Sequence, residues 1–298
     1  MARRIIVSGN CQIGGISAAL AGMLPDDEVE PVPHIPGDPG SEARHRDAVA
    51  GADVWVTNVS PTVQRTVGDA APSAPSPLYL PDVRFFGFHP DIVHVQFRDG
   101  GILQTGAAGP YNSTIVLAGW RLGLSEDEIL ARFDDATGRA LGHDRSWTTH
   151  LVELKRRVDL SDLDWAEVYL PLARGTAFML TDNHPRVDAL IHLARLAAER
   201  LGADPERVAF PWEQVVPDGL LATSEVWPVY PVVAAPLGLD GGFVWRTGSG
   251  QLLGLEEFVR RSLETYRIVD PDSLDAPELD DPRLVAALRG RRPAGASA

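Results

Sequence analysis

The sequence contains very little cysteine: Cys11 is the only one among 298 residues. A single cysteine excludes a disulfide within the chain and any structural zinc site built from several cysteines. Two roles remain for Cys11 itself, a reactive thiol or a small buried hydrophobe.

Long hydrophobic runs are also absent. The basic opening, Met1 to Arg4, is followed by only three apolar residues, Ile5, Ile6 and Val7. A signal peptide has a longer apolar stretch, and a membrane-spanning helix needs about 18 successive apolar residues. We therefore expect a soluble, cytoplasmic protein with no membrane span.

Positive charge is scarce as well. The 27 Lys and Arg residues stand against 41 Asp and Glu residues, which gives a net charge of −14, and Lys155 is the only lysine. Nucleic-acid binding needs a concentrated basic surface that neutralises phosphates, so we expect no nucleic-acid partner. A few converging arginines would still suffice for a small anionic ligand.

The N-terminal third alternates between strand and helix patterns. Strands are expected over residues 4–8, 30–35 and 52–58, with helices over 16–23 and 42–50 between them, and a further strand over 83–88. This alternation predicts an α/β fold in which a parallel sheet is flanked by helices.

The middle and C-terminal parts are rich in helix patterns, over residues 113–158, 187–201 and 255–266. Ser125 and Glu128 form a capping box at one helix start. We predict one α/β domain over residues 1–269 with a helical insertion at about 111–165. Residues 270–298 are expected to form an acidic and then disordered tail.

Cys11 stands where the first strand gives way to a helix, in the segment Ser8-Gly9-Asn10-Cys11-Gln12. The N-terminus of a helix presents free N–H groups and a positive dipole end, which lower a thiol pKa and stabilise an oxyanion. The position therefore favours Cys11 as a nucleophile, with the amides of Cys11 and Gln12 as oxyanion donors.

His184 is the candidate general base. The segment Thr181-Asp182-Asn183-His184-Pro185 stands before the helix pattern that begins near residue 186. A helix start late in the chain can meet a nucleophile at the carboxyl edge of the first strand, where open α/β sheets bind ligands. Asp182 or Asn183 would then fix the imidazole. The alternative is a surface or helix-capping histidine.

This arrangement resembles the SGNH (GDSL-type) hydrolases, in which a serine follows the first strand and an Asp-x-x-His-Pro segment opens the last helix. Cys11 replaces that serine, and the resemblance implies Asn58 as the oxyanion asparagine. The match departs at one point: Asp182 precedes His184 by two residues rather than three, and Thr181 occupies the matching position.

A second resemblance covers nearly the whole chain. The order and spacing of six short segments are similar to those of the WcbI-type polysaccharide-biosynthesis acyltransferases: residues 9–12, 86–91, 111–113, 123–125, 183–185 and 227–231. The resemblance implies an SGNH-like nucleophile region, coenzyme A or acetyl-CoA as co-substrate, and acetylation of capsule sugars.

Further polar residues are candidates for binding the acceptor or the acyl group: Asn10, His89, Asp91, Tyr111, Asn112, Ser113 and Asn183. His89 would also serve as an alternative base. The competing interpretation is structural. In it His89-Pro90-Asp91 is a turn, and Asn112 or Ser113 is the N-cap of the next helix.

Coenzyme A needs cations for its phosphates, and Arg44 and Arg121 are candidates. No metal cofactor is expected, because His143 and His150 lie seven residues apart with arginine and tryptophan between them.

Together these features predict a coenzyme A-dependent O-acyltransferase that acetylates a sugar or sugar-like hydroxyl through Cys11 and His184. Covalent and direct transfer both fit the residues. The alternatives are a thioesterase or carbohydrate esterase using the same pair, and a non-catalytic module that binds coenzyme A or a glycan.

Overall fold

The computed structural model describes residues 2–174 and 176–289. Their contacts form two compact units whose segments alternate along the sequence. Within the described residues, unit 1 comprises residues 2–84, 152–178 without 175, and 184–221, and unit 2 comprises 85–151, 179–183 and 222–289. This division differs from the single domain over residues 1–269 with an insertion at 111–165, because residues 85–110 and 222–269 pack in unit 2 with most of that insertion.

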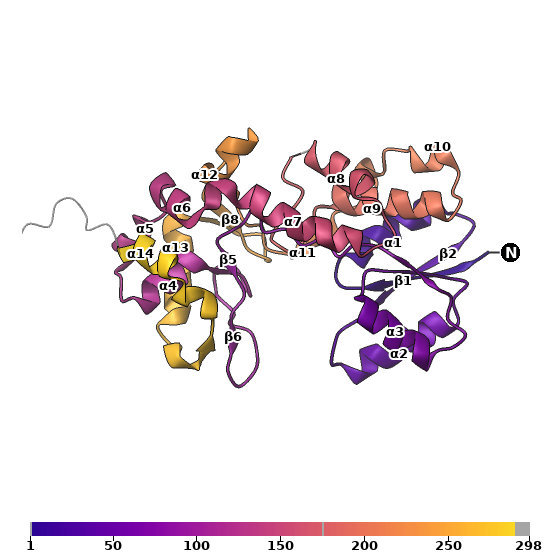
Figure 1. The fold of residues 1–298 in the computed structure, drawn as a ribbon, viewed down its shortest axis with the longest axis horizontal. Helices are drawn as coiled ribbons and strands as arrows, with labels where there is room; N and C mark the ends of the chain where they lie inside the picture. Colours follow the sequence, from indigo (N-terminus) through magenta and orange to yellow (C-terminus); the bar gives the residue numbers. More distant parts are fainter. Residues whose placement is uncertain (1, 175, 290–298) are drawn as a thin grey trace, which may run out of the picture. The chain divides into compact units, whose positions relative to one another are not determined.

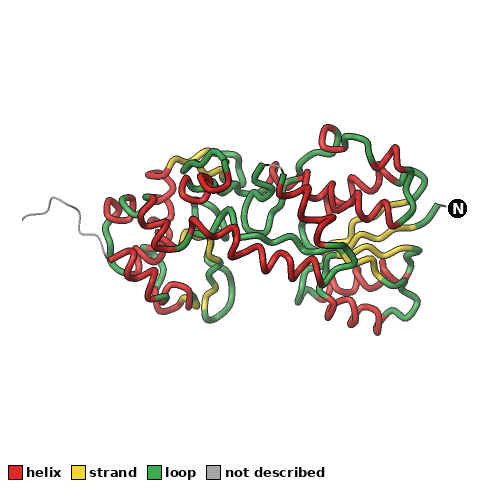
Figure 2. The backbone as a smooth tube through the Cα atoms, turned by 45° about the horizontal axis from the view of Figure 1, so that its top comes forward, coloured by secondary structure: helices red, strands yellow, loops and turns green. Residues whose placement is uncertain are grey.

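Unit 1 is built on a four-stranded parallel sheet in the order β2-β1-β3-β4. Its strands and the helices between them are β1 (Arg4–Gly9), α1 (Ile13–Met23), β2 (Glu28–Pro33), α2 (Pro39–Ala50), β3 (Val54–Thr57), α3 (Pro61–Ala70) and β4 (Pro77–Tyr79). The predicted α/β class, with a parallel sheet flanked by helices, is confirmed. Figure 2 shows the strands of this unit side by side between helices.

Helices cover both faces of this sheet, which explains why five of the six residues of β1 are buried. Helices α2 and α3 lie on one face, and α1 lies on the other with α9 (Val187–Arg200) (Figure 1). Beneath α2 and α3 the core consists of Ile6, Val32, Val49, Trp55 and Val67.

Helices α1 and α9 run side by side in the same direction. A Cβ atom on Gly15, near the start of α1, would lie 2.7 Å from Leu190 Cδ1, near the start of α9. At the other end, the Arg3 guanidinium, just before β1, donates to the Leu201 carbonyl, just after α9. Both helices therefore begin at the carboxyl edge of the sheet, where β1 ends.

The strand predicted over residues 83–88 is wrong. The backbone of Val83 is satisfied by a side chain instead of a neighbouring strand: Val83 N donates to Gln12 Oε1 and Gln12 Nε2 donates to Val83 O, at 3.1 and 2.9 Å. The fourth strand is β4, which lies outside the strands predicted from the sequence.

The remaining elements of unit 1 are α8 (Trp165–Ala173), α10 (Pro205–Val208) and a 3-10 helix, η2 (Trp212–Gln214). The unit boundaries fall inside α7 (Ser146–Asp159) and α11 (Gly219–Thr223).

Unit 2 is mainly helical with short antiparallel strand pairs. Its elements are β5 (Ile92–Val93), β6 (Gln96–Phe97), β7 (Asn112–Ser113), α4 (Thr114–Arg121), α5 (Glu126–Leu130), α6 (Asp135–Leu141), η1 (His143–Arg145), α12 (Pro231–Ala234), η3 (Ala235–Leu237), β8 (Val244–Arg246), β9 (Leu252–Gly254), α13 (Leu255–Tyr266), η4 (Pro271–Ser273), β10 (Leu274–Asp275), η5 (Pro277–Asp280) and α14 (Pro282–Arg289). The predicted capping box of Ser125 and Glu128 is confirmed at the start of α5.

Residues 270–289, expected to begin a tail, fold as part of unit 2. Strand β10 pairs with β6, and Leu274, Leu279, Leu284 and Leu288 are buried in the core of the unit. The apolar residues of α14 are spaced so that they are buried together, although the acidic composition of this segment had suggested a tail. The predicted disorder of residues 290–298 lies outside the described residues. Among those that are described, no helix combines the length and apolarity needed to cross a membrane.

Candidate active site

The turn that carries Cys11 is shaped by Gly9 and two interlocked asparagines. Gly9 has φ +153°, and a Cβ atom there would lie 1.7 Å from Asn58 Oδ1, so only glycine fits. Asn58 Oδ1 accepts a hydrogen bond from Asn10 N at 3.1 Å, and Asn58 Nδ2 donates to Asn10 Oδ1 at 2.9 Å. The ends of β1 and β3 are thereby joined next to the thiol.

The predicted oxyanion donors are engaged within this turn. Gln12 N donates to Asn10 Oδ1 at 3.0 Å, and the Asn58 amide donates to the same oxygen. The Gln12 side chain is buried and donates to Asp82 Oδ1 at 3.2 Å. Asn10 Nδ2 also donates to this carboxylate, at 2.7 Å. Asp82, which the sequence did not single out, therefore organises the surroundings of Cys11.

Cys11 itself is a free, solvent-exposed cysteine. Its pKa is raised above the ordinary value, because neighbouring protein desolvates the thiolate and the Asp82 carboxylate repels it. Its own backbone N–H and Arg84 lower the pKa, but by less. The lowered pKa expected of a helix N-terminus is thus outweighed, and at neutral pH Cys11 is a thiol that needs a base to react.

The role of Asp82 in this shift gives a pH prediction. Asp82→Asn keeps the side chain's shape and removes its charge, so the Cys11 pKa should fall and alkylation by iodoacetamide at neutral pH should be faster, by about twofold to tenfold. The apparent pKa of the alkylation rate should fall with it. Asp99→Asn, an exposed change in unit 2, is the control. A slower or unchanged rate in Asp82→Asn would refute this electrostatic role.

His184 lies three residues before α9 and is half-buried. Because α1 and α9 start at the same edge of the sheet, the structure places His184 at the edge that carries Cys11. The helix predicted over residues 187–201 is confirmed as α9, and Pro185 lies two residues before its start.

Asp182 and Asn183 belong to unit 2, and each side chain accepts hydrogen bonds within that unit. The Asp182 carboxylate, 2% exposed, accepts from His94 Nε2 at 3.1 Å on both oxygens. Asn183 Oδ1 accepts from the Tyr111 hydroxyl at 2.8 Å and from that of Thr181 at 3.1 Å. Asp182 therefore orients His94, which the sequence did not single out, and its predicted role toward His184 stays a prediction.

The His94 imidazole combines a fixed ring with access to solvent. Its side chain is 35% exposed, while the carboxylate that holds it is buried. A buried acid that orients a partly exposed histidine is the arrangement that general-base catalysis uses. No sequence spacing links the two residues, which lie 88 positions apart.

Several predicted binding residues are buried in unit 2 and engaged there. Asp91 is 0% exposed; it accepts from Ser113 Oγ at 2.5 Å, from the Tyr230 hydroxyl at 2.8 Å and from Ile115 N at 3.0 Å. Ser113 is the N-cap of α4, and Asn112 accepts from the Tyr266 hydroxyl at 3.0 Å. These contacts match the structural interpretation, with Asp91 capping α4 rather than its own turn.

His89 is also buried, with 1% of its surface exposed. Burial lowers its pKa to about 4, while the carbonyl groups of Met179 and Pro228 raise it by less. The ring is thus neutral at physiological pH and enclosed by unit 2, which does not suit the predicted role in contacting an acceptor.

The two arginines proposed for phosphate binding are both at the surface. Arg44 is exposed on α2, in unit 1. Arg121, at the end of α4 in unit 2, pairs with Asp280 at 3.4 Å. Within the described parts of the chain, no three His, Cys, Asp or Glu side chains are grouped so as to hold a metal ion.

Comparisons with known proteins agree on one family. The family model described as the polysaccharide biosynthesis enzyme WcbI matches residues 4–206. No curated protein sequence matches the chain. A solved structure of WcbI is similar over 97% of this chain and 99% of that chain, with a TM-score of 0.75 and 16% sequence identity. It is described as a novel polysaccharide biosynthesis enzyme, in its native form without a disulfide bond between coenzyme A and a cysteine.

Proposed function

The chain belongs to the WcbI family of polysaccharide biosynthesis enzymes, and from this we propose that it is a coenzyme A-dependent O-acyltransferase acting on a sugar or sugar-like hydroxyl. The observation that carries the proposal is the sole cysteine, exposed in a hydrogen-bonded turn at the sheet edge where α9 begins, three residues after His184. The description of the similar WcbI structure names coenzyme A, in a form without a disulfide bond between it and a cysteine, and this supports the choice of donor.

In the proposed reaction His184 removes the proton from the Cys11 thiol, which the raised pKa keeps protonated at neutral pH. The thiolate attacks the acyl-CoA carbonyl, a bond forms between Sγ and the carbonyl carbon, and coenzyme A leaves as a thiol with the proton from His184. His184 then takes the proton of the acceptor hydroxyl, whose oxygen attacks the acyl group and releases Cys11.

When the Cys11 thiolate attacks the acyl carbonyl, negative charge develops on the carbonyl oxygen, and this oxyanion needs hydrogen-bond donors nearby. The amide of Cys11 is proposed as the first, since it already faces the thiolate and lowers its pKa. Gln12 N and the Asn58 amide would add to it by exchanging their hydrogen bonds with Asn10. Coenzyme A phosphates at Arg44 or Arg121, and acceptor binding by Asn183 and Tyr111, are further parts of the proposal.

A hydrolase is the second candidate, because one observation favours it. Cys11 is exposed, so water can reach the thiol. A transferase must exclude water from the acyl-enzyme. With water as acceptor, the same two residues would make a thioesterase or a carbohydrate esterase.

The transferase and the hydrolase can be distinguished by measuring the release of coenzyme A thiol from acetyl-CoA, with and without a panel of sugars and nucleotide sugars. The transferase reading predicts slow release alone and faster release, with acetylated product, when an acceptor is present. Release unaffected by any acceptor would favour the hydrolase. No release under any condition, while coenzyme A still protects against thermal unfolding, would favour a binding module.

His184→Gln should slow turnover by about 10²- to 10⁴-fold, because it removes the proposed general base. An unchanged rate would show that His184 takes no part in the reaction.

A further inference from the structure

The pair formed by His94 and Asp182, which lies wholly in unit 2, has no part in the proposed reaction. Nε2 of His94 lies 3.1 Å from both carboxylate oxygens of Asp182. A carboxylate only accepts hydrogen bonds, so in the neutral ring Nε2 carries the proton and Nδ1 keeps its lone pair. The carboxylate is 2% exposed and the imidazole is 35% exposed, so a fixed ring presents a basic nitrogen without closing off solvent.

The groups that hold His94 are themselves held in place. Phe85 N donates to Asp182 O at 2.7 Å, which anchors the backbone of the acid. The Tyr111 ring packs edge-on against His94, with the ring centroids 5.3 Å apart, and its hydroxyl donates to Asn183 Oδ1 at 2.8 Å. An ordinary surface ion pair joins two flexible side chains and fixes neither of them. The surroundings of His94 instead match those of a general base that a buried acid orients.

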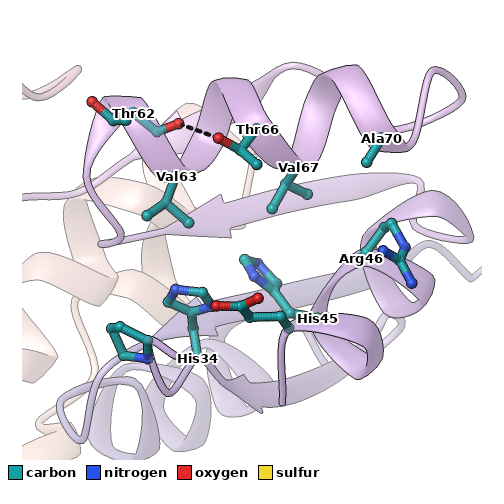
Figure 3. Close-up of a pocket in the computed structure, with 10 residues that line it drawn as sticks. His34, His45, Arg46, Thr62, Val63, Thr66, Val67 and Ala70 are labelled. Atoms are coloured by element: carbon teal, nitrogen blue, oxygen red, sulfur yellow. Dashed lines mark hydrogen bonds between the residues drawn. The ribbon is translucent and has the colours of Figure 1, made fainter. Parts of the chain in front are cut away.

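The histidines of unit 1 that line the pocket in Figure 3 show the contrast. His34 and His45 lie in a pocket of about 280 Å³ between α2 and α3, with their ring centroids 5.0 Å apart. His45 is completely buried, and neither of its ring nitrogens has a hydrogen-bond partner among the described residues. Burial, and to a smaller extent the neighbouring His34, lowers the pKa of His45 to about 4. His94 differs in having both a carboxylate partner and access to solvent.

The chain itself ties this pair to the proposed reaction. Asp182 precedes His184 by two residues, so their Cα atoms lie at most about 7 Å apart. Acyl transfer through a cysteine needs two proton removals, one from the thiol and one from the acceptor hydroxyl. A hydroxyl is far less acidic than a thiol and therefore needs a positioned base as it attacks. The acid that orients His94 thus belongs to the same short segment as the base proposed for the thiol.

We propose that His94, oriented by Asp182, is the general base for the acceptor hydroxyl, an inference that rests on the proposed function. His184 then serves only the first half-reaction, in which Cys11 is acylated. In the second, Nδ1 of His94 takes the proton of the acceptor hydroxyl. The hydroxyl oxygen bonds to the acyl carbon, and the bond from this carbon to Cys11 Sγ breaks. The proton then passes from His94 through solvent to the Cys11 thiolate, which restores both groups.

The test follows the two half-reactions separately, by rapid mixing, acid quenching and intact mass. Acetyl-CoA forms the acetyl-enzyme, whose loss is then measured in water, with the most effective sugar or nucleotide sugar of the panel, and with hydroxylamine. Hydroxylamine cleaves a thioester without the help of a base, so it reports whether the acyl group stays accessible. His94→Gln removes the proposed base. His150→Gln, the same change at a half-buried histidine of unit 2, is the matched control.

His94→Gln should form the acetyl-enzyme at the original rate but transfer the acetyl group to the sugar about 10²- to 10⁴-fold more slowly, with cleavage by hydroxylamine unchanged. The rise of the transfer rate with pH, which a titrating base produces, should be lost as well. Asp182→Asn should show the same selective loss, because an amide that donates to Nε2 forces the ring proton onto Nδ1. His150→Gln should leave both half-reactions unchanged.

Transfer to the sugar at the original rate in His94→Gln would overturn this inference and leave the proposed function standing, since the acetyl-enzyme still forms. Slower formation of the acetyl-enzyme in His94→Gln or Asp182→Asn would also overturn it, as would slower cleavage by hydroxylamine, because the change would then not be confined to activation of the hydroxyl. No acetyl-enzyme in the unsubstituted protein would overturn the covalent route, and this inference with it.

Discussion

Cys11→Ala should lower acyl transfer from acetyl-CoA by about 10³-fold or more, as expected when an enzyme loses its nucleophile. The chain has no second cysteine that would take over. Turnover is measured by thiol release and by acetylated product, with the acceptor that the panel identifies. Because Cys11 is exposed, the variant's unfolding free energy should stay within about 0.5 kcal/mol of the original.

Cys11→Ser is the companion variant, since a hydroxyl keeps the geometry but is a far weaker nucleophile than a thiolate. It should retain more activity than Cys11→Ala and less than the unsubstituted enzyme. Near-normal turnover in Cys11→Ala would show that the acyl group passes directly from coenzyme A to the acceptor, and would contradict the covalent route.

Asp91→Ala should destabilise unit 2 by about 3–5 kcal/mol, because it leaves three buried donors without an acceptor at a cost of about 1–3 kcal/mol each. The substitution leaves the hydroxyls of Ser113 and Tyr230 and the Ile115 N–H buried without their acceptor, and it uncaps α4. Urea unfolding measures the loss. Asp99→Ala, an exposed change in the same unit, should alter stability by less than about 0.5 kcal/mol.

Asp91→Asn sharpens this test through pH. Burial raises the pKa of Asp91 to about 6, above the value of 3.8 for a free aspartate. The folded protein therefore holds this proton more tightly than the unfolded chain, and the associated stability is complete below pH 3.8 and lost as pH rises through 6. Unsubstituted protein should lose stability relative to Asp91→Asn over this interval. Parallel pH profiles, or a loss in Asp91→Ala no larger than in Asp99→Ala, would contradict the structural role.

The first strands and helices of unit 1 could be predicted because local sequence patterns specify them. Short β-branched strands alternate with helices, and this alternation predicts a parallel sheet. Strand 83–88 failed for a physical reason: its apolar pattern suits a strand, but the Gln12 side chain takes the place of a neighbouring strand at Val83. The hydrophobic periodicity of a segment does not reveal that a side chain, rather than a neighbouring strand, forms its backbone hydrogen bonds.

Unit 2 could not be predicted, since its core is assembled from three separate stretches of sequence. Trp227 and Trp245 pack on Phe258 and the α14 leucines join the same core, although no local pattern connects them. The pairing of Asp182 with His94 was missed for the same reason. The neighbours of Cys11 could be predicted more fully. Gly9, Asn10 and Asn58 all lie at strand ends, where neighbouring parallel strands bring their residues together.

The measurement that tests the central claim most directly is the intact mass of the protein after rapid acid quenching of a reaction with acetyl-CoA and no acceptor. A covalent transferase should gain the mass of one acetyl group, located on Cys11 by peptide mapping, lost when an acceptor is added, and absent from Cys11→Ala. Coenzyme A thiol released by a protein whose mass never changes, at rates that Cys11→Ala preserves, would contradict the assignment of Cys11 as the nucleophile.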